Sequence, residues 1–203
     1  TGEAGIRDEN LLPRLKEVIQ DYFDHYVLRD ASENPFSFPP YGVYKSPEYA
    51  DFQTYRDAGR GFGVRSFIPL YQKDPIPHGT NSVVAHHAYA LARAGYLLNR
   101  KDYQTAAEEM LQWLLGHNPF GACMITDLGF RHPTPAHFYL RKIPYGFTAG
   151  CVGRENDTPY QEMSNALEWS TQEIWDIPWV YVIGAATYLG KDRKILEATP
   201  HSG

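Results

Sequence analysis

The stretch NSVVAHHAYALARAGYLLNRKDYQTAAEEMLQWLLG, residues 81–116, carries the clearest structural pattern in the chain. Its first half places apolar side chains every three or four positions, the spacing that gives a helix one apolar face. Asn81 or Ser82 can cap this helix. The second half repeats the spacing after a very short turn. The pattern therefore predicts an α-hairpin, with helices over 81–99 and 101–116.

Two further helices are predicted, one on each side of the hairpin. Residues 11–28 show the same apolar spacing, and Pro13 falls in the first turn, where a helix tolerates it. Residues 171–190 show the spacing again. Pro178 is expected to kink or restart that helix, and Gly190 is expected to end it.

The remaining segments show no convincing alternating strand pattern. Residues 31–48 contain four prolines and are predicted to be loop. Residues 49–59 could form a short helix that stops at Gly59, followed by loop or extended chain. Residues 117–163 form one long, mostly irregular segment, and loops of that length are usually functional. The predicted fold class is all-α, with helical hairpins and long functional loops.

Composition limits the kinds of partner. The 203 residues suffice for a single domain over 1–203, and 19 basic against 24 acidic residues give a net charge of -5. Without a long basic run, nucleic acid is not an expected partner. No stretch has the apolar length of a membrane span, and no segment is predicted to be a signal peptide. Cys123 and Cys151 are expected to be buried free thiols, with a disulfide as the alternative.

The long segment and the helix after it contain the side chains that could do chemistry. These are Asp127, Arg131, His132, His137, Arg141, Arg154, Glu155, Asn156 and Asp157, followed by Glu168, Glu173 and Asp176. A carboxylic acid in an apolar, aromatic-lined site keeps its proton and can donate it. A glycosidase needs two carboxyl groups, one to protonate the leaving oxygen and one to activate water or attack. The alternative for Glu173 is structural, because a negative charge is favoured at a helix N-terminus.

Metal binding is the less favoured interpretation. The pairs His86–His87 and His132–His137 both lack the helical i, i+4 spacing of a zinc protease. The triplet Glu155-Asn156-Asp157 offers oxygen ligands suited to Ca²⁺, although a solvated polar turn is the preferred interpretation. No cofactor or metal is expected, with Ca²⁺ as the one alternative.

Three consecutive motifs resemble a known family. The hairpin ends in Leu-Leu-Gly-His-Asn-Pro at 114–119 and leads into GFRHPTPAHFYLR at 129–141. The segment YGFTAGCVGRENDTPY at 145–160 and the helix TQEIWDIPWVYVIGAA at 171–186 follow. In this order they resemble the C-terminal part of the family 9 (cellulase-type) glycoside hydrolases, which are six-hairpin (α/α) barrels. The likeness extends over about 81–190.

The resemblance implies an inverting hydrolase of β-linked glucan or related oligosaccharides. Glu173 would be the general acid, with Glu168 as its rival. Side chains of the preceding loop and of this helix would hold the sugar: His137, Arg141, Arg131, Phe130, Tyr139 and Trp175. Aromatic side chains make up 14% of the chain, and their flat faces suit sugar rings. The family's His-His-Arg motif is here His-Phe-Tyr-Leu-Arg, a departure that affects the roles of His137 and Arg141. A secreted or periplasmic location is implied by the family alone.

The family's catalytic base, in an Asp-Ala-Gly-Asp motif, has no counterpart here. Asp57-Ala58-Gly59 lies too close to the hairpin, and Arg60 replaces the second Asp. About twelve helices of ordinary length do not fit in this chain. It is therefore expected to be the C-terminal part of a barrel, partnered by the N-terminal half or by a second copy. The alternatives are a catalytically silent carbohydrate-binding module or subunit, and a six-hairpin lyase or epimerase.

Overall fold

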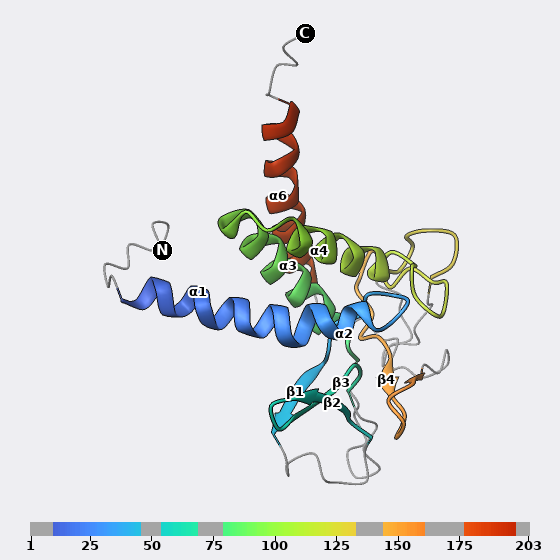
Figure 1. Cartoon of the computed structure of the whole chain (residues 1–203). Coiled ribbons are helices and arrows are strands. Elements are labelled where there is room, and N and C mark those ends of the chain that lie inside the picture. Colours follow the sequence, from blue (N-terminus) through green and yellow to red (C-terminus); the bar gives the residue numbers. More distant parts are fainter. Residues whose placement is uncertain (1–9, 46–53, 69–78, 133–143, 161–176, 198–203) are drawn as a thin grey trace.

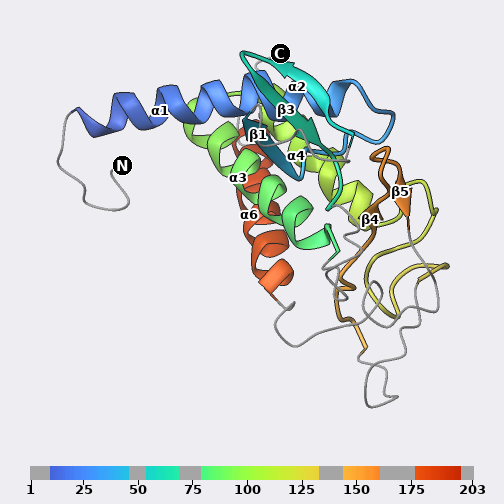
Figure 2. The same cartoon turned by 90° about the horizontal axis from the view of Figure 1, so that it is seen from below.

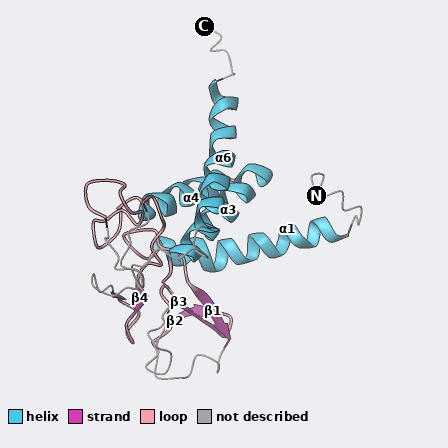
Figure 3. Cartoon of the chain, turned by 180° about the vertical axis from the view of Figure 1, so that it is seen from behind, coloured by secondary structure: helices cyan, strands magenta, loops and turns pink. Residues whose placement is uncertain are grey.

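The computed structural model describes residues 10–45, 54–68, 79–132, 144–160 and 177–197. Helices form one part of the molecule, and short antiparallel strands and long loops gather at one side of them (Figure 3). The fold is thus mixed, with both helices and sheets, and the prediction of an all-α chain is wrong. The strands were missed because they are very short: none exceeds four residues, too few to show an alternating pattern.

The predicted hairpin is confirmed. Helix α3 spans Asn81–Leu98 and helix α4 spans Lys101–Leu114, and Asn99 between them adopts a left-handed conformation that ends α3. The residue at the N-cap position of α3 is Thr80 rather than Asn81 or Ser82. A third helix, α6, spans Ile177–Glu197 and packs along α3, so that α3 lies between α4 and α6 (Figures 1 and 2).

Small and apolar side chains make this three-helix contact the centre of the core. Fully buried alanines on α3 and α4 let the helices approach closely, and larger buried side chains fill the space between them: Val84, Leu91, Tyr103, Met110, Trp113 and Leu114. Helix α6 continues through Gly190, so the prediction that it ends there is wrong. Pro178 is the second residue of α6 as described, a position that needs no amide hydrogen. The residues before Ile177, which would show the predicted kink or restart, lie outside the described residues.

The predicted N-terminal helix is confirmed and is longer than expected. Helix α1 (Leu11–Tyr22) continues through one π-helical turn at Phe23–Val27 into α2 (Leu28–Ser32). No residue of α1 is buried, and its N-terminal part extends away from the other helices (Figure 1). The π-turn is the part that docks, since Asp24 accepts hydrogen bonds from Tyr103 (2.8 Å) and Arg100 (2.9 Å) at the start of α4.

Three strands form the first sheet: β1 (Gly42–Lys45), β2 (Arg56–Gly59) and β3 (Phe62–Arg65), in the order β1-β3-β2 and all antiparallel. The turn between β2 and β3 has positive φ at three consecutive residues, Gly59, Arg60 and Gly61. Two glycines there allow the reversal. The short helix predicted before Gly59 is therefore wrong, and the tempting Asp57 lies on β2 in this hairpin.

A second, two-stranded sheet lies within the long segment after α4. It pairs β4 (Val152–Gly153) with β5 (Pro159–Tyr160). Among the described helices, none combines the length and the apolar character that a membrane span requires.

Candidate functional site

The long loop after α4 is held from its first residues by Asn118. This buried side chain donates to the carbonyl oxygens of Trp113 (2.7 Å) and Ala122 (2.8 Å) and accepts from the amides of Phe120 and Ala122. The Asn-Pro sequence that follows the predicted helix therefore also fixes the start of the loop, through the side chain of Asn118. A single amide group can do this because it carries two donors and an acceptor with two lone pairs.

The described parts of the loop form a compact core rather than a plain connector. Met124 and Thr148 are hydrogen-bonded side by side, and Ile125 pairs with Phe147 as an isolated antiparallel bridge. All four residues are buried. The two described parts of the loop, around residues 124 and 147, therefore contribute apolar side chains to the main core.

Two contacts attach this loop core to helices on either side. Asn81, at the start of α3, donates its side-chain amide to the carbonyl oxygen of Thr148 at 3.0 Å. On the other side, the indole N–H of Trp179 in α6 donates to the carbonyl oxygen of Tyr145 at 2.9 Å. The Trp179 ring also meets the ring of Phe147 edge-on, with ring centroids 4.8 Å apart. The loop is consequently fixed between the first turns of α3 and α6.

Only two of the residues predicted to act on substrate lie in the described part of the chain. Phe130 is fully exposed, and Arg131 is exposed while its carbonyl oxygen accepts the amide of Cys123 at 2.8 Å. The structure therefore presents both at the surface of the loop. The other predicted site residues lie outside the described residues: Glu173, Glu168, His137, Arg141, Tyr139 and Trp175.

A second Asn-Pro-Phe sequence, at 34–36, makes a loop that faces the first one. The Asn34 side chain donates to the carbonyl oxygens of Asp30 and Phe38, and accepts from the amides of Phe36 and Phe38. This arrangement presents Phe38 against Trp113 with ring centroids 4.3 Å apart. A loop was predicted over residues 31–48, but its place in the site was not, although the repeated Asn-Pro-Phe was a visible signal.

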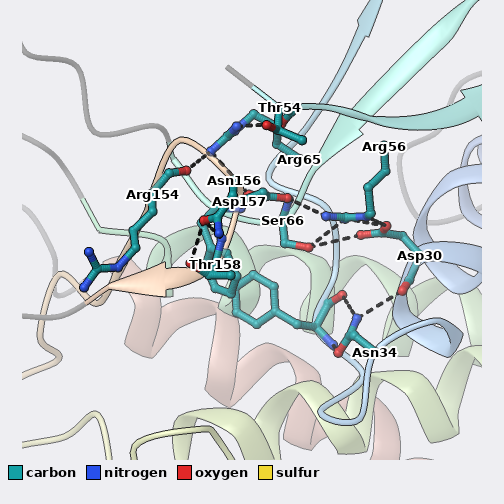
Figure 4. Close-up of polar contacts among 12 residues, drawn as sticks. Asp30, Asn34, Thr54, Arg56, Arg65, Ser66, Arg154, Asn156, Asp157 and Thr158 are labelled. Carbon is teal, nitrogen blue, oxygen red and sulfur yellow. Dashed lines mark hydrogen bonds and ion pairs between the residues drawn. The ribbon is translucent and has the colours of Figure 1, made fainter. Parts of the chain in front are cut away.

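A cluster of buried charges lies beside these loops (Figure 4). Arg56 on β2 donates to Asp30 of α2 at 2.6 Å and to Asp157 at 2.5 Å, and it also bonds the hydroxyl of Ser66 at 2.8 Å. Asp157 also accepts the amides of Ser66 and Phe67. One guanidinium thus joins three parts of the chain: α2, the first sheet and the turn at 154–158.

Burial and ion pairing shift the pKa of Asp30 in this cluster in opposite directions. Burial raises the pKa of the Asp30 carboxyl above its ordinary value, and the hydrogen bonds from Arg56 counteract this shift. The fully buried Arg65 donates to the carbonyl oxygens of Thr54 (2.6 Å) and Arg154 (2.7 Å), which fixes the same turn from the other side. The turn at 154–158 is thereby held by charge-assisted bonds.

A cavity of about 330 Å³ opens between the two Asn-Pro-Phe loops. Aromatic rings and prolines make up one part of its wall, and the charged cluster makes up another. The residues that line it are Asp30, Glu33, Asn34, Pro35, Phe36, Phe38, Arg56, Ser66, Phe67, Trp113, Pro119, Asp157, Thr158 and Pro159. It has the mixed character and the size of small-molecule sites.

The triplet considered for Ca²⁺ is occupied by protein donors. Both carboxylate oxygens of Asp157 accept protein hydrogen bonds, and Asn156 accepts from the hydroxyl of Thr158 at 2.7 Å. Within the described ranges, no three His, Cys, Asp or Glu side chains cluster as a metal site would require. Cys123 and Cys151 are both buried, and no disulfide joins them, as expected.

Comparisons with known proteins relate this chain to one fold. No protein-family model matches the sequence, and no curated protein matches it. The structure is similar to the crystal structure of a metagenome-derived glycoside hydrolase family 9 endoglucanase, with a TM-score of 0.56 and 20% sequence identity. The match covers 90% of this chain and 30% of that one, so the chain spans about a third of the length of the endoglucanase. The likeness shows a distant relationship in fold, in agreement with the predicted resemblance.

Proposed function

We propose that this chain is the acid-bearing part of an inverting glycoside hydrolase that acts on β-linked glucans or related oligosaccharides. The observation that carries the proposal is the similarity in fold to a family 9 endoglucanase over nine-tenths of the chain. The order of the hairpin, the loop and the final helix in the sequence supports the same assignment.

Glu173 is the proposed general acid, with Glu168 as its rival. Glu173 lies four positions before the first described residue of α6, and that end of α6 is tied to the loop core through Trp179 and Tyr145. The same long loop offers Phe130 and Arg131 at its surface, which supports a role for it in binding substrate. His137 and Arg141 are proposed to hold the sugar beside the scissile bond.

The test is an assay of the protein, together with any polypeptide that co-purifies with it, on a soluble mixed-linkage β-glucan. An inverting reaction releases the α-anomer first, which proton NMR detects before mutarotation. Glu173→Gln should abolish hydrolysis and leave glucan affinity nearly unchanged, because Gln keeps the shape but has no proton to give. Full activity in Glu173→Gln together with loss in Glu168→Gln would transfer the role to Glu168.

The same assay tests whether the catalytic base lies in this chain or in a partner polypeptide. Activity of the chain alone would place the base within its 203 residues. Binding without hydrolysis would favour the silent carbohydrate-binding module, and products that absorb in the ultraviolet would favour a lyase.

A further inference from the structure

We propose that the cavity between the two Asn-Pro-Phe loops binds one uncharged pyranose unit of a glycan. The ligand class rests on the proposed function, whereas the site itself is assigned from the geometry of the described residues. Its walls come from α2, the first sheet, the C-terminal end of α4 and the turn at 154–158.

The cavity is preformed, because each of its two loops is fixed by one asparagine. Asn34 and Asn118 each bind four backbone groups, so the rings and prolines that follow them are already in place. Arg56 fixes the opposite wall by joining Asp30 to Asp157. A ligand that enters such a site does not have to offset the cost of ordering its walls.

The lining suits a ligand with an apolar face and a hydroxylated edge. The half-buried ring of Phe36 and the exposed prolines of both loops offer apolar surface, and a pyranose has C–H faces that can pack against it. The buried rings of Phe38, Phe67 and Trp113 lie behind this surface. The opposite wall contains carboxylates, which would lose water without compensation if a purely apolar molecule filled the cavity. Sugar hydroxyls can donate to these carboxylates.

Two carboxylates have capacity left for such donors. The Oδ2 atom of Asp30 accepts only a long bond, 3.4 Å, from the hydroxyl of Ser66 among the described contacts. The exposed Glu33 pairs with Arg29 at 3.4 Å, a loose contact that a ligand hydroxyl can replace. Both groups lie in the lining of the cavity.

The charge of the lining selects against anions. Among the residues that line the cavity, Asp30, Glu33 and Asp157 outnumber one cation, Arg56, which is already bonded to both aspartates. Outside the lining, Arg29 pairs with Glu33 at 3.4 Å and Arg65 lies 3.5 Å from Asp157. A uronic acid or a sugar phosphate would add a negative charge beside three carboxylates whose arginine partners are already paired, and repulsion is stronger where water is partly excluded. The cavity is therefore expected to accept neutral sugars and to reject acidic ones.

The experiment follows the indole N–H signals of the four tryptophans by NMR, with Trp113 assigned through Trp113→Phe. The full chain is titrated at millimolar concentrations with methyl β-glucopyranoside and, separately, with methyl β-glucuronopyranoside. A saturable shift of the Trp113 signal with the neutral glycoside alone is expected. An unmoved Trp113 signal, or an equal response to the glucuronide, would overturn the proposal.

Two exposed glutamates supply the matched variants. Glu33→Ala should weaken binding of the neutral glycoside about tenfold, because it removes a charged acceptor from the cavity. Glu17→Ala, at an exposed position on α1, should leave the affinity unchanged. Equal affinity in Glu33→Ala and the unaltered protein would place the sugar elsewhere and refute the site.

Failure of the pocket and failure of the hydrolase assignment give different results. Glu173→Gln should retain the Trp113 response in either case, since that response does not depend on hydrolysis. A response without any hydrolysis would leave the pocket standing and remove the hydrolytic function. Hydrolysis without a shift of the Trp113 signal would refute the sugar site in the cavity and leave the hydrolytic function standing.

Discussion

Asn34 and Asn118 make nearly the same four hydrogen bonds in two loops that face each other. Each donates to a carbonyl oxygen of the preceding helix and to that of the residue four positions on, and each accepts from the amides two and four positions on. Phe36 of the first loop contacts His117 of the second, with ring centroids 5.7 Å apart. The paired loops form the frame of the cavity.

Removal of either asparagine should destabilise the protein, and Asn118 should matter more. Asn118→Ala leaves buried backbone groups without partners, so its free energy of unfolding should fall by about 2–4 kcal/mol. Asn34 is only half-buried, and Asn34→Ala should cost about 1–2 kcal/mol. Urea denaturation measures both losses.

The matched control is Asn156→Ala, which removes an exposed asparagine whose side chain, among the described contacts, accepts from Thr158 alone. It should change stability by less than about 0.5 kcal/mol. A loss in Asn118→Ala no greater than this would show that the loop needs no anchor.

Arg56 should be worth more to stability than an exposed arginine. Arg56→Met leaves the buried Asp30 without a cation and Asp157 with only the longer contact to Arg65 at 3.5 Å. The expected cost is about 2–3 kcal/mol after allowance for the partial exposure of Arg56 itself. Chemical denaturation at neutral pH is the measurement. Arg60→Met, which breaks the exposed pair with Asp21, should produce little change.

His87 should make the protein less stable as pH falls below about 6.5. Its Nδ1 lies 3.0 Å from the carbonyl oxygen of Val83 and its Nε2 lies 3.2 Å from the hydroxyl of Tyr22. Burial lowers the pKa of His87, so the unfolded chain takes up a proton at a pH where the folded chain does not. The free energy of unfolding is then fully retained above about pH 6.5 and decreases below it, by at most about 1.4 kcal/mol per pH unit.

The variant His87→Gln should remove this fall, as measured by urea denaturation between pH 7.5 and 5, a range chosen to span the ordinary histidine pKa of about 6.5. His86→Gln is the control, because the exposed neighbour stacks on Tyr181 at the helix surface. An unchanged pH profile in His87→Gln would mean that other groups cause the loss.

Two glycines of α6 should respond in opposite directions to alanine. A methyl group at Gly184 would lie 2.6 Å from the ring of Tyr89, so Gly184→Ala should destabilise the contact between α3 and α6 by about 1–3 kcal/mol. Nothing lies within 4 Å of that position at Gly190, and Gly190→Ala should stabilise the helix by about 0.5–1 kcal/mol. Thermal unfolding of both variants would reveal the difference in sign. A loss in Gly190→Ala would contradict the helical environment there.

The local pattern of the sequence was sufficient for the helices. The hairpin of α3 and α4 and the helix from residue 11 follow from apolar side chains three and four positions apart, since helix hydrogen bonds join near neighbours in the chain. The same pattern predicted that the second helix of the hairpin ends where the long loop begins, and α4 does end there. It also overestimated burial, because Leu15 and Val18 belong to the apolar stripe of α1 and are nevertheless exposed.

The sheet and the cavity depended on contacts between distant parts of the chain. Strand β3 pairs with β1 across a long connection, and Arg56 meets partners 26 and 101 positions away. No periodicity of four-residue strands reveals such partners, because β pairing and ion pairing join residues whose proximity only the fold creates. The sequence thus determined where helices form and where the long loop begins. The tertiary structure decided that two Asn-Pro-Phe loops meet, and that the partly buried Arg56 joins the carboxylates of the wall beside them.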